Sequence, residues 1–128
     1  RDFDTSRGPF MLPTTTPVQF EPDALHATID RLMSYGLQRI FQTHFGPVTD
    51  LERLAGDLHA ALHELVRIAR AHAQAPDRRA RIERDMFDYF DAKLDAHGYA
   101  GDLARRHAFI DDDVRLNTAG LEVWLARA

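Results

Sequence analysis

The chain has 128 residues, about the length of one small domain with a single core. Its formal net charge of -4, from 16 basic and 20 acidic residues, argues against a general nucleic-acid-binding surface. The absence of cysteine excludes disulfides, thiolate catalysis and cysteine-based zinc sites, and it is compatible with a reducing cytoplasm.

No apolar run approaches the roughly 20 residues that a membrane-spanning helix needs. The first residues, Arg1-Asp2-Phe3-Asp4, do not resemble a signal peptide, and the sequence starts without methionine, which suggests that an upstream segment was removed or omitted. We therefore expect a soluble, cytoplasmic chain that binds neither nucleic acid nor a membrane.

The first 48 residues predict an extended segment, a helix and a short strand. Proline and glycine are frequent up to residue 21 and favour extended or irregular backbone, with at most a short strand at Phe10-Met11-Leu12. A helix is expected at about residues 22–35, because proline suits its first position and apolar residues follow at helical spacing. A strand-like run then covers residues 37–43 and is closed by Gly46-Pro47.

Two long helices are expected next. Thr49-Asp50-Leu51-Glu52 fits a capping box, which predicts a helix start there, and apolar residues continue at helical spacing until the break at Ala75-Pro76. Asp77 can cap the following helix, which is expected to end near Gly98. Because long amphipathic helices joined by a short turn tend to pack antiparallel, this part predicts a helical hairpin.

The last part of the chain predicts two further helical pieces. A short helix is expected around residues 103–109, followed by a break in which Asp111-Asp112-Asp113 caps the last helix, which carries Leu121, Trp124 and Leu125. The expected fold is mainly α, with the terminal helix laid across the hairpin. The helical stripes need a cover and the short β pieces cannot form a complete sheet, so the chain is expected to lack its sheet partners.

Four phrases occur in an order that resembles a known family. They are Pro13-Thr14-Thr15-Thr16-Pro17-Val18-Gln19-Phe20, Ile29-Asp30-Arg31-Leu32, Ile40-Phe41-Gln42-Thr43-His44-Phe45-Gly46 and, at the end, Leu116-Asn117-Thr118-Ala119-Gly120-Leu121-Glu122-Val123-Trp124-Leu125. This order is similar to the C-terminal end of metallo-β-lactamase-fold hydrolases with an added helical domain, as in glyoxalase-II-like members. The resemblance implies a C-terminal fragment of an αββα fold, with residues 1–48 ending the metallo-β-lactamase-like domain and residues 49–128 forming a helical extension.

The resemblance implies that His44 is a metal ligand, because the family places its final metal-binding histidine in a Thr-His-Phe/Tyr-Gly turn. The family's dinuclear centre, with zinc, iron or manganese, activates water for hydrolysis of an ester, thioester or similar bond. Without the resemblance, His44 is interpreted as a histidine that caps a strand end or packs in a turn. No catalytic residue and no other cofactor-binding residue is assigned.

The other ligands of such a centre come from upstream in the family: a His-x-His-x-Asp-His motif, a further histidine and a bridging aspartate. Asp4-Thr5 matches the context of the aspartate only faintly, because no glycine precedes it. The upstream part of its own chain is therefore the expected partner. One imidazole cannot hold a catalytic metal, so this chain alone is expected to bind none and to be inactive.

Three other groups of residues leave alternatives open. His59 and His63 lie at i, i+4 on one helix and form either a metal site or a polar flank; the glutamate that a zincin helix needs after the first histidine is missing. The cluster Arg78-Arg79-Ala80-Arg81 is interpreted as a solvated face with ion pairs rather than a phosphate site, and Phe87-Asp88-Tyr89-Phe90 as core packing rather than a pocket. The remaining histidines are expected at the surface: His26, His72, His97 and His107.

The rival function is a non-catalytic helical interaction or dimerisation module. In this alternative the two long helices use their apolar stripes to bind a partner or a second copy of the chain, which would give a homo-oligomer. The substrate, the metal and the oligomeric state are left open by the sequence.

Overall fold

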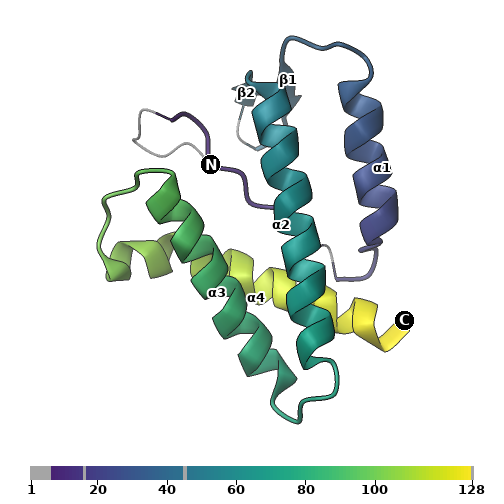
Figure 1. Cartoon of the computed structure of the whole chain (residues 1–128), viewed down its shortest axis with the longest axis vertical. Coiled ribbons are helices and arrows are strands. Elements are labelled where there is room, and N and C mark those ends of the chain that lie inside the picture. Colours follow the sequence, from purple (N-terminus) through teal and green to yellow (C-terminus); the bar gives the residue numbers. More distant parts are fainter. Residues whose placement is uncertain (1–6, 16, 45, 128) are drawn as a thin grey trace.

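The computed structural model describes residues 7–15, 17–44 and 46–127 (Figure 1). In these residues the elements are α1 (Pro22–Met33), β1 (Ile40–Gln42), β2 (Gly46–Val48), α2 (Leu51–His72), α3 (Arg78–Ala96) and α4 (Leu103–Arg127). The prediction of a mainly α-helical chain is confirmed. Phe10-Met11-Leu12 forms no strand.

The two short strands form an antiparallel hairpin that pairs Ile40 with Val48 and Gln42 with Gly46. The predicted strand is therefore present. Its partner was missed, because Gly46-Pro47 was assigned to the closing turn, whereas both residues belong to β2. Proline lacks the N–H that a ladder needs, and a two-stranded sheet leaves each strand with an outer edge where this costs nothing.

The positions at which α2 and α3 start were predicted well, but the side-chain caps predicted for them are not formed. The residue before α2 is Asp50, with a left-handed φ of 46°, and its side chain forms no cap hydrogen bond. The helix begins one residue later than the capping box requires, so Arg53 rather than Glu52 occupies the third helical position. The Asp50 carboxylate pairs with the Arg53 guanidinium, and the predicted capping box is not formed.

Asp77 precedes α3 as expected but also forms no cap hydrogen bond, because its carboxylate accepts from Arg81 Nε at 2.6 Å. A side-chain cap occurs instead before α4. There Asp102 Oδ1 accepts from the backbone N–H of Arg105 at 2.9 Å. Asp102 was not among the predicted caps.

The predicted break in the last helix is wrong, because α4 is continuous through the three aspartates. Asp111 accepts from His107 Nδ1 at 2.8 Å, one turn earlier, and Asp112 lies 3.0 Å from Arg115 Nη1. These pairs satisfy carboxylates within helical geometry. Ile110 and Val114 meanwhile continue the buried face, so packing and charge pairing both favour an unbroken helix.

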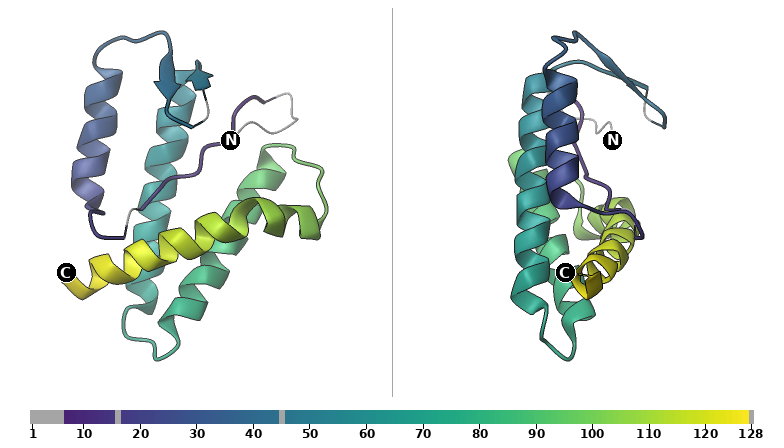
Figure 2. Two further views of the ribbon diagram at one scale, coloured as in Figure 1. Left: turned by 180° about the vertical axis from the view of Figure 1, so that it is seen from behind. Right: turned by 90° about the vertical axis from the view of Figure 1, so that its right-hand side faces the viewer.

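The helices form two layers. Helices α1, α2 and α3 are connected so that α2 runs antiparallel to both of its neighbours, and α4 crosses α2 and α3 on one face (Figure 2). The predicted helical hairpin with a terminal helix across it is therefore observed. The largest fully buried side chain is Phe90 of α3, which packs with Leu62 and Leu65 of α2 and Leu121 of α4.

One hydrophobic core joins residues from both predicted segments. Phe10, Phe20 and Ile29 belong to the same cluster as the buried residues of α2, α3 and α4. The apolar stripes of the long helices are thus covered largely by one another, and the expected need for an external cover does not apply to them. The boundary between residues 48 and 49 stays a prediction.

A buried polar contact fastens the N-terminal segment to α4. Thr15 N–H donates to Asn117 Oδ1 at 2.8 Å, Thr15 Oγ1 donates to the Asn117 carbonyl at 2.8 Å, and Asn117 Nδ2 donates to the Pro13 carbonyl at 3.0 Å. Thr15 and Asn117 are both almost completely buried. Two of the phrases that carry the family resemblance therefore meet in the folded chain.

Gly120 allows this contact to be close. A Cβ at that position would lie 1.9 Å from the Thr15 carbonyl oxygen, so the segment reaches α4 only because glycine has no side chain.

Candidate functional site

His44 lies between the two strands of the hairpin and is exposed to solvent. It follows β1 by two residues and precedes Gly46, whose positive φ of 75° is a backbone conformation that glycine adopts readily. The expected placement of this imidazole, at the end of a short strand and before a glycine, is observed. Phe45 and the faint Asp4-Thr5 match lie outside the described residues.

Apolar side chains are exposed at the same end of the molecule. The exposed fractions are 71% for Phe41 on β1, and 59% for Tyr35 and 44% for Leu37 in the connection from α1 to β1. An apolar cleft of about 150 Å³ lies between α1, α2 and the hairpin and is lined by Ile40 and Leu32, among other residues. The groove is lined by Ile40 and Gln42 of β1, whereas His44 lies beyond that strand and does not line it.

The described residues do not by themselves fit a catalytic metal centre. Among them, no group of three or more histidine, aspartate or glutamate side chains is arranged to hold a metal ion. His44 would be a single donor to a site completed by residues from elsewhere.

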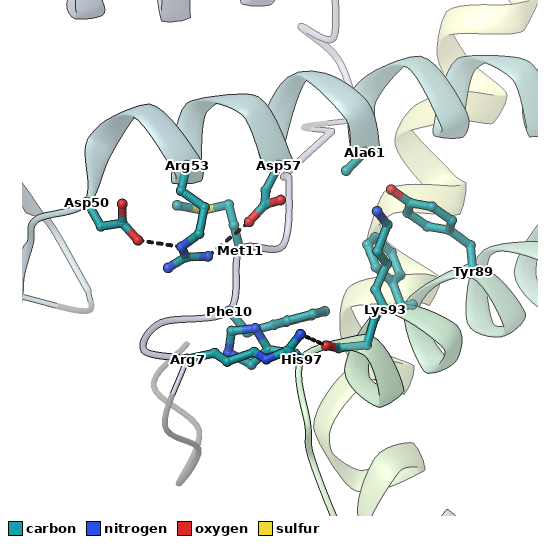
Figure 3. A pocket seen from close by; sticks show the side chains of 12 residues that line it. Arg7, Phe10, Met11, Asp50, Arg53, Asp57, Ala61, Tyr89, Lys93 and His97 are labelled. Atoms are coloured by element: carbon teal, nitrogen blue, oxygen red, sulfur yellow. Dashed lines mark hydrogen bonds and ion pairs between the residues drawn. The ribbon is translucent and has the colours of Figure 1, made fainter.

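A second cleft, of about 450 Å³, lies between α2, α3 and the N-terminal segment (Figure 3). Arg53 of α2 lies between two carboxylates: it pairs with Asp50, and its Nη1 is 3.0 Å from Asp57 Oδ2. The segment itself is held by His97 Nε2, which donates to the Gly8 carbonyl at 2.7 Å. Arg53 Nη2 also donates to the Pro9 carbonyl at 3.3 Å, so Arg53 is paired with two carboxylates and helps to hold the segment rather than forming a ready receptor for an anion.

Tyr89 and Lys93 form the α3 wall of this cleft (Figure 3). The Lys93 ammonium lies 5.6 Å from the centre of the Tyr89 ring, within the range of a cation–π contact. Burial raises the pKa of the Tyr89 hydroxyl, and the carboxylates of Glu64 and Asp57 raise it further. Tyr89 is therefore a neutral hydroxyl at ordinary pH and not an activated base.

Three histidines meet between α1 and α2. His26 Nδ1 lies 2.6 Å from His59 Nδ1, and the His26 ring stacks on the His63 ring with centroids 4.3 Å apart. His59 Nε2 lies 3.1 Å from Asp30 Oδ1. We refer to His26, His59 and His63 as the histidine cluster.

The surroundings of His26 disfavour its charged form. Partial burial lowers the pKa of His26 most, and His63 and His59 lower it further, whereas Asp30 and Asp23 oppose the change. The neutral form of His26 is thus favoured in the packed structure.

The expectation that the other histidines lie at the surface is largely wrong. His26 is half-buried in the cluster, and His97 is half-buried against the N-terminal segment. His72 is also half-buried and bridges α2 and α3, with Nε2 2.6 Å from Asp85 Oδ2. Only His107 of these four is exposed, and it pairs with Asp111.

The histidine cluster had a signal in the sequence that was overlooked. His26 and Asp30 lie at i, i+4 on α1, as His59 and His63 do on α2, so each helix carries a polar pair on one side of its apolar stripe. The antiparallel packing of α1 on α2 brings the two pairs together.

The ion pairs expected of the basic cluster are present, and the core packing expected of the aromatic cluster is observed, although Tyr89 and Phe90 also line the cleft of about 450 Å³. Arginines of the basic cluster form ion pairs within α3, including Arg79 Nε to Glu83 Oε1 at 3.1 Å, and Arg79 also reaches Glu122 of α4 at 3.0 Å. In the aromatic cluster Phe90 is buried in the core, with Phe87 and Tyr89 packed against it. Within residues 7–15, 17–44 and 46–127, no helix combines the length and apolar character needed to cross a membrane.

Comparison with known proteins does not test the family resemblance. No family model matches the chain, and neither the curated proteins nor the solved structures give a match. The relation to metallo-β-lactamase-fold hydrolases therefore stays a prediction from the sequence phrases.

Proposed function

We propose that this chain is the C-terminal portion of a metal-dependent hydrolase of the metallo-β-lactamase fold, acting on an ester, thioester or similar bond. The observation that carries the proposal is the place of His44, an exposed imidazole that follows a short strand and precedes a glycine with positive φ. In the intact protein His44 contributes one ligand to a divalent metal, with zinc as the first candidate and iron or manganese as alternatives. The remaining ligands come from upstream.

The hairpin that carries His44 supports this proposal. A two-stranded hairpin is marginally stable by itself, and here its outer edges have no strand partner among the described residues, while Phe41 on β1 and Tyr35 and Leu37 in the connection before it are exposed. Pairing with further strands from an upstream domain would satisfy the edges and cover these side chains. We therefore propose the upstream part of its own chain as the partner of this surface.

The helical part of the chain has a supporting role in this proposal. Helices α2, α3 and α4 form a compact packed unit whose first helix starts three residues after Val48 of the hairpin. By analogy with the family, we propose that this unit shapes access to the active site or forms a subunit contact in the intact enzyme. The chain alone is expected to be inactive, and the intact enzyme is proposed to be cytoplasmic.

A non-catalytic interaction or dimerisation module is the alternative. The stripes of α2 and α3 are buried, so this alternative now rests on the apolar residues at the hairpin end, above all Phe41 and Tyr35. The sequence encoded ahead of Arg1 in the parent gene distinguishes the two. A His-x-His-x-Asp-His motif there supports the hydrolase, and a parent gene without it leaves the module.

An activity assay tests the role of His44 directly. The protein with its upstream segment is assayed on ester and thioester substrates, beside a His44→Gln variant and a His107→Gln control at an exposed histidine of α4. Loss of a ligand is expected to lower hydrolysis by at least the roughly 10- to 100-fold that outer-sphere partners cost, while the control keeps the parental rate. Equal rates in all three proteins would remove His44 from the proposed centre.

A further inference from the structure

The contact between His26 and His59 can hold only one hydrogen atom between the two Nδ1 atoms. The ring centroids are 4.9 Å apart with an interplanar angle of 6°, and this separation equals the 2.6 Å Nδ1···Nδ1 contact plus the two ring radii. The rings therefore lie end to end in one plane rather than face to face. Two nitrogens at this distance share one hydrogen atom.

The neighbouring carboxylate fixes which ring donates that hydrogen. A carboxylate only accepts hydrogen bonds, so His59 Nε2 carries the hydrogen directed at Asp30 Oδ1. Neutral His59 then presents a bare Nδ1, which accepts from His26 Nδ1–H. A proton on His59 Nδ1 is tolerated only if His26 changes to its Nε2–H tautomer and accepts, whereas protonation of both rings places two N–H groups against each other and breaks the contact.

The third ring adds a penalty for charge. His63 stacks on His26 at 4.3 Å, so protonation of both rings would bring two positive charges into contact. The carboxylates that act on His26 are Asp23 and Asp30, both on α1, and Asp30 is 74% exposed, so solvent screens much of its effect.

Helix α1 has fewer fully buried residues than α2, although Leu25 and Met33 also pack partly buried against the core. Ile29 is the buried residue of α1, whereas α2 buries seven residues. A helix with so little buried surface opens at a lower free-energy cost than the core helices.

We propose that the histidine cluster makes the packing of α1 on α2 acid-sensitive, so that α1 separates from α2 when the cluster takes up protons. The described residues hold no group of three or more side chains arranged for a metal, so the cluster is assigned a proton-dependent role rather than a metal-binding one. Because α1 leads into β1, its separation displaces the hairpin that carries His44. The movement of α1 does not depend on the proposed hydrolase function.

The direction of the pH dependence follows from His26. Its pKa is lowered by burial and by the other two histidines, so the separated form binds protons more readily than the packed form. Packing is therefore complete above the ordinary histidine value of 6.5 and weakens as the pH falls below it. Each proton taken up only by the separated form changes the ratio of the two forms by up to about tenfold per pH unit.

Distance measurement between two spin labels tests the proposal. The chain has no cysteine, so Ala27→Cys on α1 and Ala60→Cys on α2, both exposed, give a labelled pair that spans the contact. Double electron–electron resonance is recorded at about pH 7.5 and about pH 5, the range in which histidine ordinarily changes charge. EDTA is present throughout, so that bound metal cannot cause a change.

The expected result is a longer and broader distance distribution at the lower pH in the labelled parent and in His107→Gln, a control outside the cluster. In His26→Phe, which keeps a ring against His63 but cannot titrate, the distribution is expected to stay as it is at pH 7.5. An unchanged distribution in the parent, or a parental response in His26→Phe, overturns the proposal. If His26→Phe loses helical content, His59→Gln takes its place, and a full parental response there overturns the proposal equally.

Discussion

Replacement of Gly120 by alanine sets local helix propensity against tertiary packing, and the two predict opposite signs. Gly120 lies inside α4, where alanine is favoured over glycine by about 1 kcal/mol in an exposed helix. A Cβ at this position, however, would lie 1.9 Å from the Thr15 carbonyl oxygen and 2.8 Å from its carbon. Both are backbone atoms and cannot rotate away.

The expected size of the effect follows from what must move. Thr15 is tied to Asn117 by hydrogen bonds from its N–H and its hydroxyl, so displacing the segment weakens both. Overpacking costs about 1 to 3 kcal/mol and each weakened hydrogen bond about 1 kcal/mol, against a propensity gain of about 1 kcal/mol. Gly120→Ala is therefore expected to lower the free energy of unfolding by about 2 to 4 kcal/mol.

The matched control is Gly56→Ala in α2, because Gly56 is exposed and an added Cβ there meets nothing within 4 Å. This variant is expected to gain about 0.5 to 1 kcal/mol. Urea unfolding, followed by circular dichroism and by the fluorescence of Trp124, measures both. If Gly120→Ala proves as stable as the parent or more so, the close approach of the N-terminal segment to α4 is wrong.

Three further predictions concern the contacts between elements. Asn117→Ala leaves the Thr15 N–H and the Pro13 carbonyl without their partner, and urea unfolding is expected to show a loss of about 2 to 4 kcal/mol; a loss below about 1 kcal/mol would contradict it. The pKa of Asp85 is lowered mainly by its hydrogen bond from His72, so in His72→Leu, which has no donor, it is expected to rise toward 3.8, as measured by carboxyl carbon NMR. The stability that this lowered pKa supplies is present above pH 3.8 and is lost as the pH falls below it. The variant is therefore expected to gain less folding stability when Asp85 loses its proton. An unchanged pKa of Asp85 in the variant would refute the role of His72. Ile110→Ala is expected to cost about 2 to 5 kcal/mol and Asp112→Ala within about 0.5 kcal/mol, because Ile110 is fully buried and Asp112 is 91% exposed; a large cost at Asp112 would restore the predicted cap.

Local sequence signals predicted the first three helices well. Pro22 marks the start of α1, and Ala75-Pro76 separates α2 from α3, because proline acts on the backbone within one or two residues. The apolar spacing of α2 and α3 predicted their buried faces for the same reason. The mainly α fold was therefore readable from residues close in sequence.

The features that were missed depend on partners distant in sequence. The three aspartates favour a break in isolation, but the helix around them packs on α3, and Ile110 and Val114 are buried in the core. From the sequence, His26 was interpreted as a surface residue, because its partner His59 is 33 residues away and is brought to it only by the packing of α1 on α2. The close approach at Gly120 likewise appears only when the N-terminal segment crosses α4.

The proposed function requires His44 to be one ligand of a metal centre whose other ligands lie upstream. The most direct test is elemental analysis of the protein purified with its upstream segment, beside His44→Ala and the control variant His107→Ala. We predict bound zinc, iron or manganese in the parent and in the control, and a markedly lower content in His44→Ala. Equal metal content in the parent and His44→Ala, or no metal in the parent, would contradict the account.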